Sequence, residues 1–378
     1  MQHGRLSVTV LCLALLGACD EPQRDDTPQR HIDRQPVIST EADLASTEIS
    51  VLIYNVAGLP WPLACNKRSR TLDEDGNRIP IACNRAAALA DIGDRLGELR
   101  SRGAEPDVIM LQEAFIKASE EVVTRGGYRN WVAGPTSDDL GEPHSERAHA
   151  GFIAARSFLK GEKFGKWQSS GLIIASDYPI HVRYSHPFNQ WECAGYDCLA
   201  NKGILTVELD IPGLPDPLAI ATTHYNSRGA SGVSRERALI AHNLQVDDTD
   251  EHLYDLQRLY LPFIWGGDLN MRHDESRLAY FVNRSEQSGR DAGGFNEVSS
   301  FCLDNPDRCE LRIPLASDAP WFETQDLQGW SHGYRVRIEP VSMELAFDEP
   351  VDGLMLSDHN GVLVRYRLTW PAELTRPF

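Results

Sequence analysis

The stretch Phe263-Ile264-Trp265-Gly266-Gly267-Asp268-Leu269-Asn270 changes abruptly from apolar residues to glycine, carboxylate and amide. Its apolar part has the length and flanking residues of a buried strand. Gly267 permits close backbone approach at the end of that strand. The strand therefore ends in Asp268 and Asn270, and α/β sheets commonly place their sites at such strand ends.

The same pattern recurs four more times along the chain. The apolar runs Val51–Tyr54, Val108–Leu111, Leu218–Ala221 and Leu354–Leu356 lead into Asn55, Gln112-Glu113, Thr222-Thr223-His224 and Ser357-Asp358-His359, respectively. A single Glu or His after a strand is usually a solvated loop residue. Five such endings together indicate one shared site.

The remaining periodicity completes an α/β pattern. Leu172–Ala175 is typical of a further buried strand, and residues 203–211 alternate between apolar and polar side chains. Asn84 can cap a helix with Leu89, Ile92, Leu96 and Leu99 on one face, and Ser234 can cap a second helix. Since no repeat or linker divides residues 48–378, we predict one domain there.

Composition excludes several classes of protein. The chain has 378 residues, 42% of them hydrophobic and 24% charged, which excludes a wholly disordered or fibrous protein. The formal net charge of −18 argues against a nucleic-acid binder with a broad basic face. A metal-dependent phosphodiesterase stays compatible with it, because a bound ion can supply positive charge. A second long apolar stretch is absent, so a polytopic membrane protein is excluded.

The N-terminus resembles a targeting segment. Arg5 precedes the apolar run Leu6–Leu16, which leads into Leu16-Gly17-Ala18-Cys19. This resembles the bacterial lipobox, so residues 1–18 are predicted to be a signal peptide and Cys19 to be acylated; a plain secretory signal is the alternative. Residues 19–47 hold three prolines and no aromatic residue, which predicts a disordered tether. We expect an exported lipoprotein of the cell envelope, facing the periplasm or the surface.

Six further cysteines suit an exported protein. Their even number suggests disulfides, and the simplest pairing joins sequence neighbours: Cys65 with Cys83, Cys193 with Cys198, and Cys302 with Cys309. Zinc is the competing interpretation, but C-x4-C and C-x6-C are poor ligand spacings and no histidine completes them.

The clustered residue types suit metal-assisted hydrolysis of a phosphoester. Magnesium prefers oxygen ligands, which Asn55, Glu113 and one or two aspartates can supply. Such an ion neutralises phosphate oxygens, while two histidines with carboxylate neighbours divide the acid and base work. A serine or cysteine nucleophile has no comparable support in the sequence.

In this order, Tyr54-Asn55, Gln112-Glu113, Thr223-His224, Gly267-Asp268-Leu269-Asn270 and Ser357-Asp358-His359 resemble the motifs of the endonuclease/exonuclease/phosphatase superfamily. The resemblance extends from about Ile49 to Leu368 and implies a four-layer α/β sandwich, with two packed mixed sheets flanked by helices. Three stretches, 169–180, 201–205 and the His224 segment with the Arg235/Arg237 helix, are similar to the neutral sphingomyelinase branch.

The resemblance also implies roles for individual residues. Glu113 would be the principal magnesium ligand, with Asn55 beside it and Asp358 as a further metal ligand. Asp268 and Asn270 would position or activate the attacking water and orient the phosphate. We expect His359 to be the base and His224 the leaving-group acid or a donor to phosphate. Asp326 best matches the aspartate that orients a catalytic histidine in the family; an ordinary turn aspartate is the alternative.

These observations predict a magnesium-dependent phosphodiesterase acting on a sphingomyelin-like phospholipid at a membrane surface, with Mn²⁺ or Co²⁺ as possible substitutes. A secreted nuclease or phosphatase on the same frame is the alternative, and a catalytically silent binding module is a third reading. We expect a monomer without a stable nucleic-acid partner. The membrane-contact hairpin of secreted bacterial sphingomyelinases has no clear equivalent; the available aromatics are Trp61, Phe188, Trp191, Trp321 and Phe322.

Overall fold

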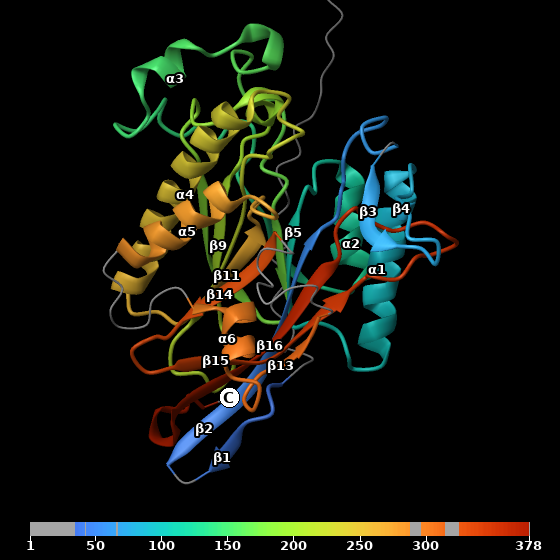
Figure 1. The fold of residues 1–378 in the computed structure, drawn as a ribbon. Helices are drawn as coiled ribbons and strands as arrows, with labels where there is room; N and C mark the ends of the chain where they lie inside the picture. The colour runs from blue at the N-terminus through green and yellow to red at the C-terminus, as the bar shows by residue number, and fades with distance from the viewer. Residues whose placement is uncertain (1–34, 42, 66, 288–295, 314–324, 378) are drawn as a thin grey trace, which may run out of the picture. The chain divides into compact units, whose positions relative to one another are not determined.

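Two β-sheets face each other, and helices cover their outer faces (Figure 1). This architecture comes from a computed structural model that describes residues 35–41, 43–65, 67–287, 296–313 and 325–377. Asp33–Phe378 form one compact unit, whereas residues 1–32, including the signal segment and Cys19, lie outside the described residues. The predicted four-layer α/β sandwich is confirmed.

The first sheet has the strand order β13-β15-β16-β2-β5-β7-β6, and β1 pairs with β2. Its strands are β1 (Ser39–Glu41), β2 (Leu44–Asn55), β5 (Val108–Gln112), β6 (Asn130–Ala133), β7 (Ile173–Ser176), β13 (Glu310–Arg312), β15 (Arg337–Ala346) and β16 (Gly361–Pro371). The central strands β2 and β5 are parallel, so Asn55 and Gln112 end side by side. Both side chains are fully buried.

The second sheet has the order β12-β14-β11-β10-β9-β8. Its strands are β8 (Ile180–Pro187), β9 (Gly203–Leu209), β10 (Leu218–His224), β11 (Phe263–Asp268), β12 (Asn296–Glu297) and β14 (Asp326–Ser331). Strands β10 and β11 are parallel, and β14 is antiparallel to β11. A separate two-stranded sheet of β3 (Arg68–Leu72) and β4 (Arg78–Pro80) lies in the excursion after β2.

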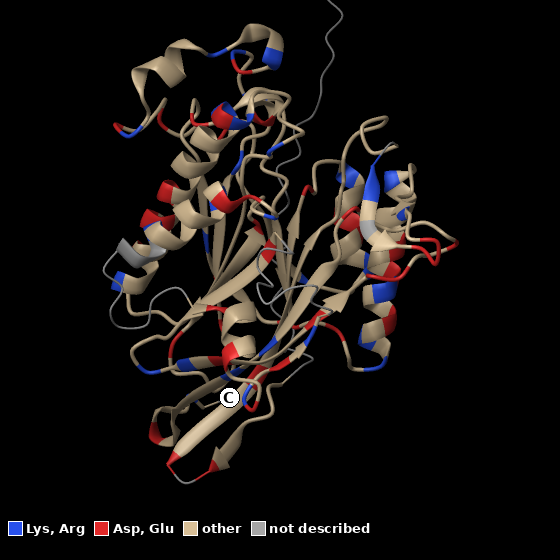
Figure 2. Ribbon diagram, viewed as in Figure 1, with Lys and Arg blue, Asp and Glu red and all other residues tan. Residues whose placement is uncertain are grey.

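Helices α1 (Arg85–Ser101) and α2 (Glu120–Arg125) pack on the first sheet, and α4 (Arg235–Arg258) and α5 (Glu275–Gln287) on the second (Figure 1). The short helices α3 (Ala150–Ala154) and α6 (Val298–Asp304) belong to the longer connections. Asn84 and Ser234 cap α1 and α4 as predicted, because each side chain accepts a backbone N–H of the first turn. Basic and acidic residues are interspersed along these outer helices (Figure 2).

Buried amide side chains connect the two sheets. Gln112 Nε2 donates to Thr222 Oγ1 at 3.0 Å. Gln328 Nε2 donates to the carbonyls of Val51 and Val362 at 3.1 and 3.0 Å. In an otherwise apolar interface, these directional bonds fix how the strand ends of one sheet face those of the other.

The structure corrects the boundary of the predicted tether. Residues 39–41 are strand β1, and β2 begins at Leu44, so residues 39–47 are not all tether. The prediction missed them because only alternate side chains, Ala45 and Thr47, are buried there. The backbone of residues 44–47 pairs with the end of β16, and β1 pairs with β2. Amino-acid composition does not reveal such pairing.

One predicted strand is wrong. Leu354–Leu356 makes only isolated bridges, one of them between Met355 and Ile81. Met355 is buried because it packs against Ile81 and Ala57, not because it belongs to a ladder. Among the described residues, no helix combines the length and the apolar character needed to cross a membrane.

All three predicted disulfides are confirmed, with Cα–Cα distances of 4.4, 5.2 and 4.7 Å for Cys65–Cys83, Cys193–Cys198 and Cys302–Cys309. Each closes a short excursion of the chain. The first closes the segment between β2 and α1, in which Ile79 and Ile81 are buried against Ala57 and Met355.

Candidate active site

Neighbouring strands of the second sheet place three of the predicted residues in one row. In the parallel pair β10–β11, His224 lies opposite Asp268, and in the antiparallel pair β11–β14, Asp268 lies opposite Asp326. All three side chains are buried. Asn55, at the end of β2 in the facing sheet, donates from Nδ2 to Asp268 Oδ2 at 3.0 Å. The two sheets therefore converge on Asp268.

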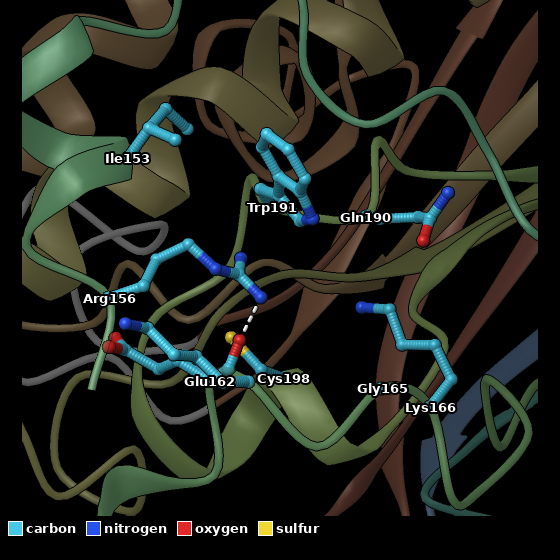
Figure 3. Close-up of a pocket in the computed structure, with 9 residues that line it drawn as sticks. Ile153, Arg156, Glu162, Gly165, Lys166, Gln190, Trp191 and Cys198 are labelled. Atoms are coloured by element: carbon cyan, nitrogen blue, oxygen red, sulfur yellow. Dashed lines mark hydrogen bonds between the residues drawn. The ribbon is translucent and has the colours of Figure 1, made fainter. Parts of the chain in front are cut away.

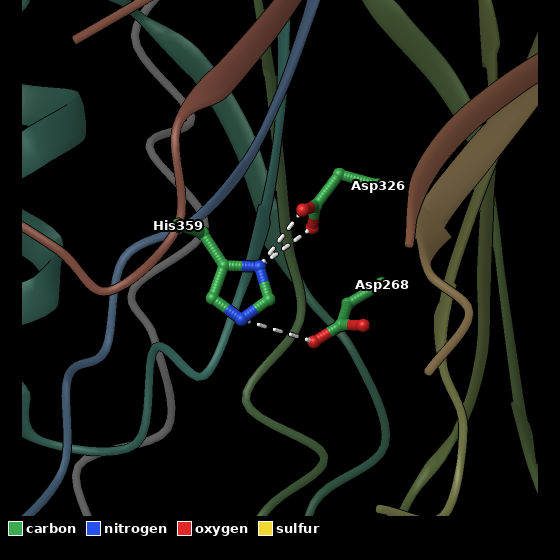
Figure 4. Close-up of side chains that lie close together, drawn as sticks. All are labelled: Asp268, Asp326 and His359. Carbon is green, nitrogen blue, oxygen red and sulfur yellow. Dashed lines mark hydrogen bonds and ion pairs between the residues drawn. The ribbon is translucent and has the colours of Figure 1, made fainter. Parts of the chain in front are cut away.

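His359 lies between two carboxylates (Figure 4). Its Nδ1 is 2.8 and 2.9 Å from the two oxygens of Asp326, and its Nε2 is 3.7 Å from Asp268 Oδ2. A carboxylate at Nδ1 favours the tautomer with the proton on that nitrogen, which leaves Nε2 as the basic atom. This is the arrangement of a histidine base oriented by an aspartate.

Hydrogen bonds anchor the loop that carries His359 to the end of β2. Ser357 Oγ donates to the Asn55 carbonyl at 2.6 Å and accepts the His359 N–H at 3.3 Å. The buried Arg85 donates to the carbonyls of Val56 at 2.8 Å and Leu356 at 2.5 Å. The end of β2 and the segment before His359 are therefore fixed to each other.

Glu113 and Asp358 converge on one cation. Lys67 Nζ lies 3.4 Å from Glu113 Oε2 and 2.9 Å from Asp358 Oδ2. Burial opposes the charge of Lys67, but Glu113 and Asp358 outweigh that effect and raise its pKa. Burial likewise works against the charged form of Asp358, yet His359 and Lys67 hold its pKa below the ordinary value. Glu113 and Asp358 therefore form a binding position for a positive charge.

His224 is buried beside Asp268. Burial first, and then the positive charges of Lys202, His359 and Lys67, lower its pKa well below the ordinary value. Its Nε2 is 3.5 Å from Asp268 Oδ2. An imidazole in this position can donate an N–H to a substrate oxygen.

The backbone at the site is unusual at three positions. Glu113 and Asn270 have positive φ values of 54° and 51°, which cost energy for residues with a Cβ and are frequent at functional sites. At Gly267, a Cβ would lie 1.9 Å from the Thr223 carbonyl oxygen, so only glycine allows β10 and β11 to approach this closely. The Asn270 N–H donates to Asp268 Oδ1 at 3.0 Å, and its side-chain amide donates to the Tyr225 carbonyl at 3.1 Å.

The structure brings together all eight residues predicted for the catalytic centre: Asn55, Glu113, His224, Asp268, Asn270, Asp326, Asp358 and His359. Sequence analysis missed Lys67, which joins Glu113 and Asp358. Its only signal is its position two residues after Cys65, and no motif distinguishes it from a solvated lysine. Gln325, the residue before Asp326, also lies at the site, with its Nε2 3.5 Å from His359 Nε2.

Two groups of side chains in the site could hold a metal ion. Ligand atoms of Asp268, Asp326 and His359 lie within 4.8 Å of one another. In this group, however, Nδ1 of His359 is already engaged by Asp326. Glu113 and Asp358 form the second group, and the Oδ1 atom of Asp358 is buried without a hydrogen-bond partner among the described residues.

Similar solved structures share this fold at low sequence identity. Beta toxin from Staphylococcus aureus is 15% identical over 84% of this chain and 99% of its own, with a TM-score of 0.53. Sphingomyelinase C from Streptomyces griseocarneus is 17% identical over the same shares, with a TM-score of 0.51. A humanized TDP2 from D. rerio is 15% identical over 84% and 98% of the two chains, also with a TM-score of 0.51.

Sequence comparison agrees with the arrangement of the site. A search of curated protein sequences finds no match. The sequence pattern of the Endonuclease/Exonuclease/phosphatase family, in contrast, matches residues 53–359, a range that begins two residues before Asn55 and ends at His359. The chain belongs to the Endonuclease/Exonuclease/phosphatase family.

Proposed function

We propose that this protein is a magnesium-dependent phosphodiesterase that hydrolyses a sphingomyelin-like phospholipid by attack of water on phosphorus. The observation that carries the reaction class is His359, held by Asp326 on one side and facing Asp268 on the other. Membership of the family supports hydrolysis of a phosphoester. The neutral sphingomyelinase-like stretches of the sequence support the choice of lipid.

The residues fit a magnesium ion at Glu113 and Asp358. Both donors are carboxylates, they already converge on a positive charge, and Asp358 Oδ1 is buried without a partner among the described residues. Asn55, at the end of β2, pairs with Gln112, the residue before Glu113, and its carbonyl accepts a hydrogen bond from Ser357, the residue before Asp358. Oxygen donors of this kind suit magnesium. A beta-toxin structure of the same fold contains bound magnesium ions. When bound, the ion would neutralise phosphate oxygens and stabilise developing negative charge.

The protein's own side chains supply the proton transfers. Nε2 of His359 accepts a proton from the attacking water, and Asp326 orients the ring and stabilises the imidazolium that forms. Asp268 lies next to Nε2 and can position the same water. His224 Nε2, 3.5 Å from Asp268 Oδ2, faces the same centre and would pass a proton to the leaving oxygen or donate its N–H to a phosphate oxygen.

The experiment compares two substrates under matched conditions. We expect magnesium-dependent release of phosphocholine from sphingomyelin in mixed micelles, with much slower nicking of plasmid DNA at the same low salt. An acidic chain gains little from the polyanionic field of DNA, whereas a cationic choline group meets no repulsion. Asp268→Ala controls for contaminating enzymes.

Three outcomes separate the alternatives. Efficient plasmid cleavage with intact sphingomyelin would replace this proposal by the nuclease. Release of inorganic phosphate from a phosphomonoester alone would identify a phosphatase. A folded protein inactive on every phosphoester would support the silent binding module, which the retention of all eight site residues disfavours.

A further inference from the structure

A cavity of about 470 Å³ lies between residues 153–166 and the Cys193–Cys198 loop, and no residue of the candidate active site lines it. Arg156, Lys163 and Lys166 supply its basic lining, and Trp191 forms part of its wall. The side chains of Arg156 and Lys166 point toward the same space (Figure 3). Three basic side chains at one cavity are notable in a chain with a net charge of −18.

The carboxylate that lines the cavity does not neutralise these cations. Glu162 Oε1 pairs with Arg237 Nε at 2.6 Å and accepts the Gly195 N–H at 2.9 Å. Its Oε2 accepts the Ser157 N–H at 2.5 Å. Because both oxygens of Glu162 are already engaged by Arg237 and by two backbone N–H groups, its attraction for Arg156 offsets only part of the positive charge of the three basic side chains.

Two of these cations have unused hydrogen-bonding capacity. Arg156 donates from Nη2 to the backbone carbonyl of Glu162, but its Nη1 is buried without a partner among the described residues. Within the described ranges, the hydrogen-bond contacts of Lys166 Nζ are long, 3.4 Å to the Ala200 carbonyl and 3.9 Å to Cys193 Sγ. Burial, followed by Arg156 and Lys202, lowers the pKa of Lys166 to about 8. An anion in the cavity would satisfy both groups.

An exposed apolar surface adjoins the cavity in the same segment. We call Phe158, Leu159, Phe164 and Trp167 the aromatic patch. Leu159 and Trp167 are 84% and 64% exposed. The ring of Phe164 lies 4.2 Å from that of Phe158 and 5.3 Å from that of Trp167, centroid to centroid. Large exposed apolar clusters of this kind mark interaction surfaces.

We propose that the cavity binds the phosphate-bearing head group of an anionic phospholipid while the aromatic patch enters the surface of the bilayer. The cationic lining selects a phosphate, and the patch selects a lipid over a soluble phosphate compound, because aromatic and apolar side chains gain free energy at the membrane interface. Basic residues between the apolar ones add attraction to anionic lipids. The proposal concerns binding and does not depend on hydrolysis.

The five aromatic residues that the sequence offers for membrane contact do not belong to the aromatic patch. Phe188 is buried, Trp191 lines the cavity, and Trp61 is exposed on the excursion after β2. Trp321 and Phe322 lie outside the described residues. The apolar residues of the proposed surface come instead from the excursion between β6 and β7.

Binding is measured by co-sedimentation with vesicles in the presence of a chelator, so that metal-dependent hydrolysis does not contribute. Residues 19–378 with Cys19→Ser are used, which removes the apolar N-terminal run and the acylation site. We expect strong binding to phosphatidylcholine vesicles that contain phosphatidylglycerol and weak binding to phosphatidylcholine alone. Brominated phospholipids should quench tryptophan fluorescence in the wild type, and less so in Trp167→Phe.

Variants separate the cavity from the patch. Arg156→Gln and Lys166→Gln should each weaken binding to anionic vesicles by about fivefold, the scale of one basic side chain at a membrane. Leu159→Ser with Trp167→Ser should weaken binding by at least about tenfold through lost apolar burial. Arg183→Gln and Tyr334→Ser alter exposed residues elsewhere and should leave binding unchanged. If Arg156→Gln fails to fold, the exposed Lys163→Gln replaces it.

Equal binding to neutral and anionic vesicles would overturn the head-group assignment. Saturable binding of glycerol phosphate without binding to vesicles would show a site for soluble phosphates and overturn the membrane assignment. Because all measurements are made without hydrolysis, a protein that binds anionic vesicles but leaves sphingomyelin intact would refute only the proposed substrate.

Discussion

His359 depends on Asp326 for its orientation, since Asp326 contacts its Nδ1 with both carboxylate oxygens. Asp326→Asn keeps the size but removes the charge that fixes the tautomer. We predict that kcat for a chromogenic phosphodiester falls by about 10²–10⁴-fold with little change in KM, the scale of general acid–base catalysis. Steady-state kinetics across a pH series measures both quantities.

The matched control for this prediction is His359→Ala alone and combined with Asp326→Asn. If Asp326 acts through His359, the double variant is no slower than His359→Ala. A further loss in the double variant would show that Asp326 acts on its own, for example as a ligand in the Asp268–Asp326–His359 group.

Lys67 holds the position between Glu113 and Asp358 that a metal ion would use. Lys67→Met should therefore tighten magnesium or manganese binding by about tenfold, because unit charges about 4 Å apart interact by roughly 1–4 kcal/mol between water and a protein surface. Glu113→Gln should weaken binding. Titration calorimetry measures both, with the exposed Lys117→Met as control. Weaker binding in Lys67→Met would mean that Lys67 orders the carboxylates rather than competing for them.

Among the elements, the excursion from Trp61 to Cys83 links the stability of the fold to the geometry of the candidate active site. It carries Lys67, and it packs on the segment before Ser357 through Ile81, which bridges to Met355. The Cys65–Cys83 disulfide closes it, with a sequence separation of 18. The geometry of Glu113 and Asp358 thus depends on a disulfide that contributes no atom to the site.

We predict that Cys65→Ala with Cys83→Ala lowers the free energy of unfolding by about 3 kcal/mol, as expected for a loop of that size. It should also alter metal affinity, because Lys67 is no longer held between the two carboxylates. The matched control is Cys302→Ala with Cys309→Ala. That disulfide closes a shorter loop that carries no site residue, so its removal should lower stability without altering metal affinity. Equal effects of both pairs on metal affinity would contradict this role.

For the whole molecule, buried neutral histidines make stability depend on pH. Burial lowers the pKa of His242 to about 3 and that of His252 to about 4. In the unfolded chain, histidines take up protons near pH 6.5. The unfolded state therefore binds more protons below that pH, and the free energy of unfolding falls as the pH drops from about 6.5 toward 4.

The test replaces one of these histidines. His252→Gln should make the fall in the free energy of unfolding shallower by up to about 1.4 kcal/mol per pH unit between pH 6.5 and 4. Urea unfolding at several pH values measures the slope, and His149→Gln, which removes an exposed imidazole, is the control. Parallel slopes for wild type and His252→Gln would contradict a neutral, partly buried His252 in the folded protein.

We propose that the whole molecule is held at the cell envelope through Cys19. Protein purified from membranes should carry lipid on Cys19, and Cys19→Ser should release it in soluble form; mass spectrometry of the N-terminal peptide and fractionation check both. A soluble wild-type protein with an unmodified Cys19 would support the plain secretory signal instead.

The sequence by itself determined the layers of the fold and which polar residues at the strand ends meet at the candidate site. Strand ends such as Gly267-Asp268 and caps such as Asn84 are local signals, because burial and turn geometry act on consecutive residues. The neighbouring cysteines paired as predicted for the same reason.

Only the tertiary structure decided what depends on distant partners. The position of Lys67 between Glu113 and Asp358, the pairing of Asp326 opposite Asp268, and the start of the domain before residue 47 all depend on such partners. So does the cavity around Arg156 and Lys166. The physical reason is that a salt bridge, a strand register or a cavity is set by the packing of segments far apart in the chain, which no local pattern encodes.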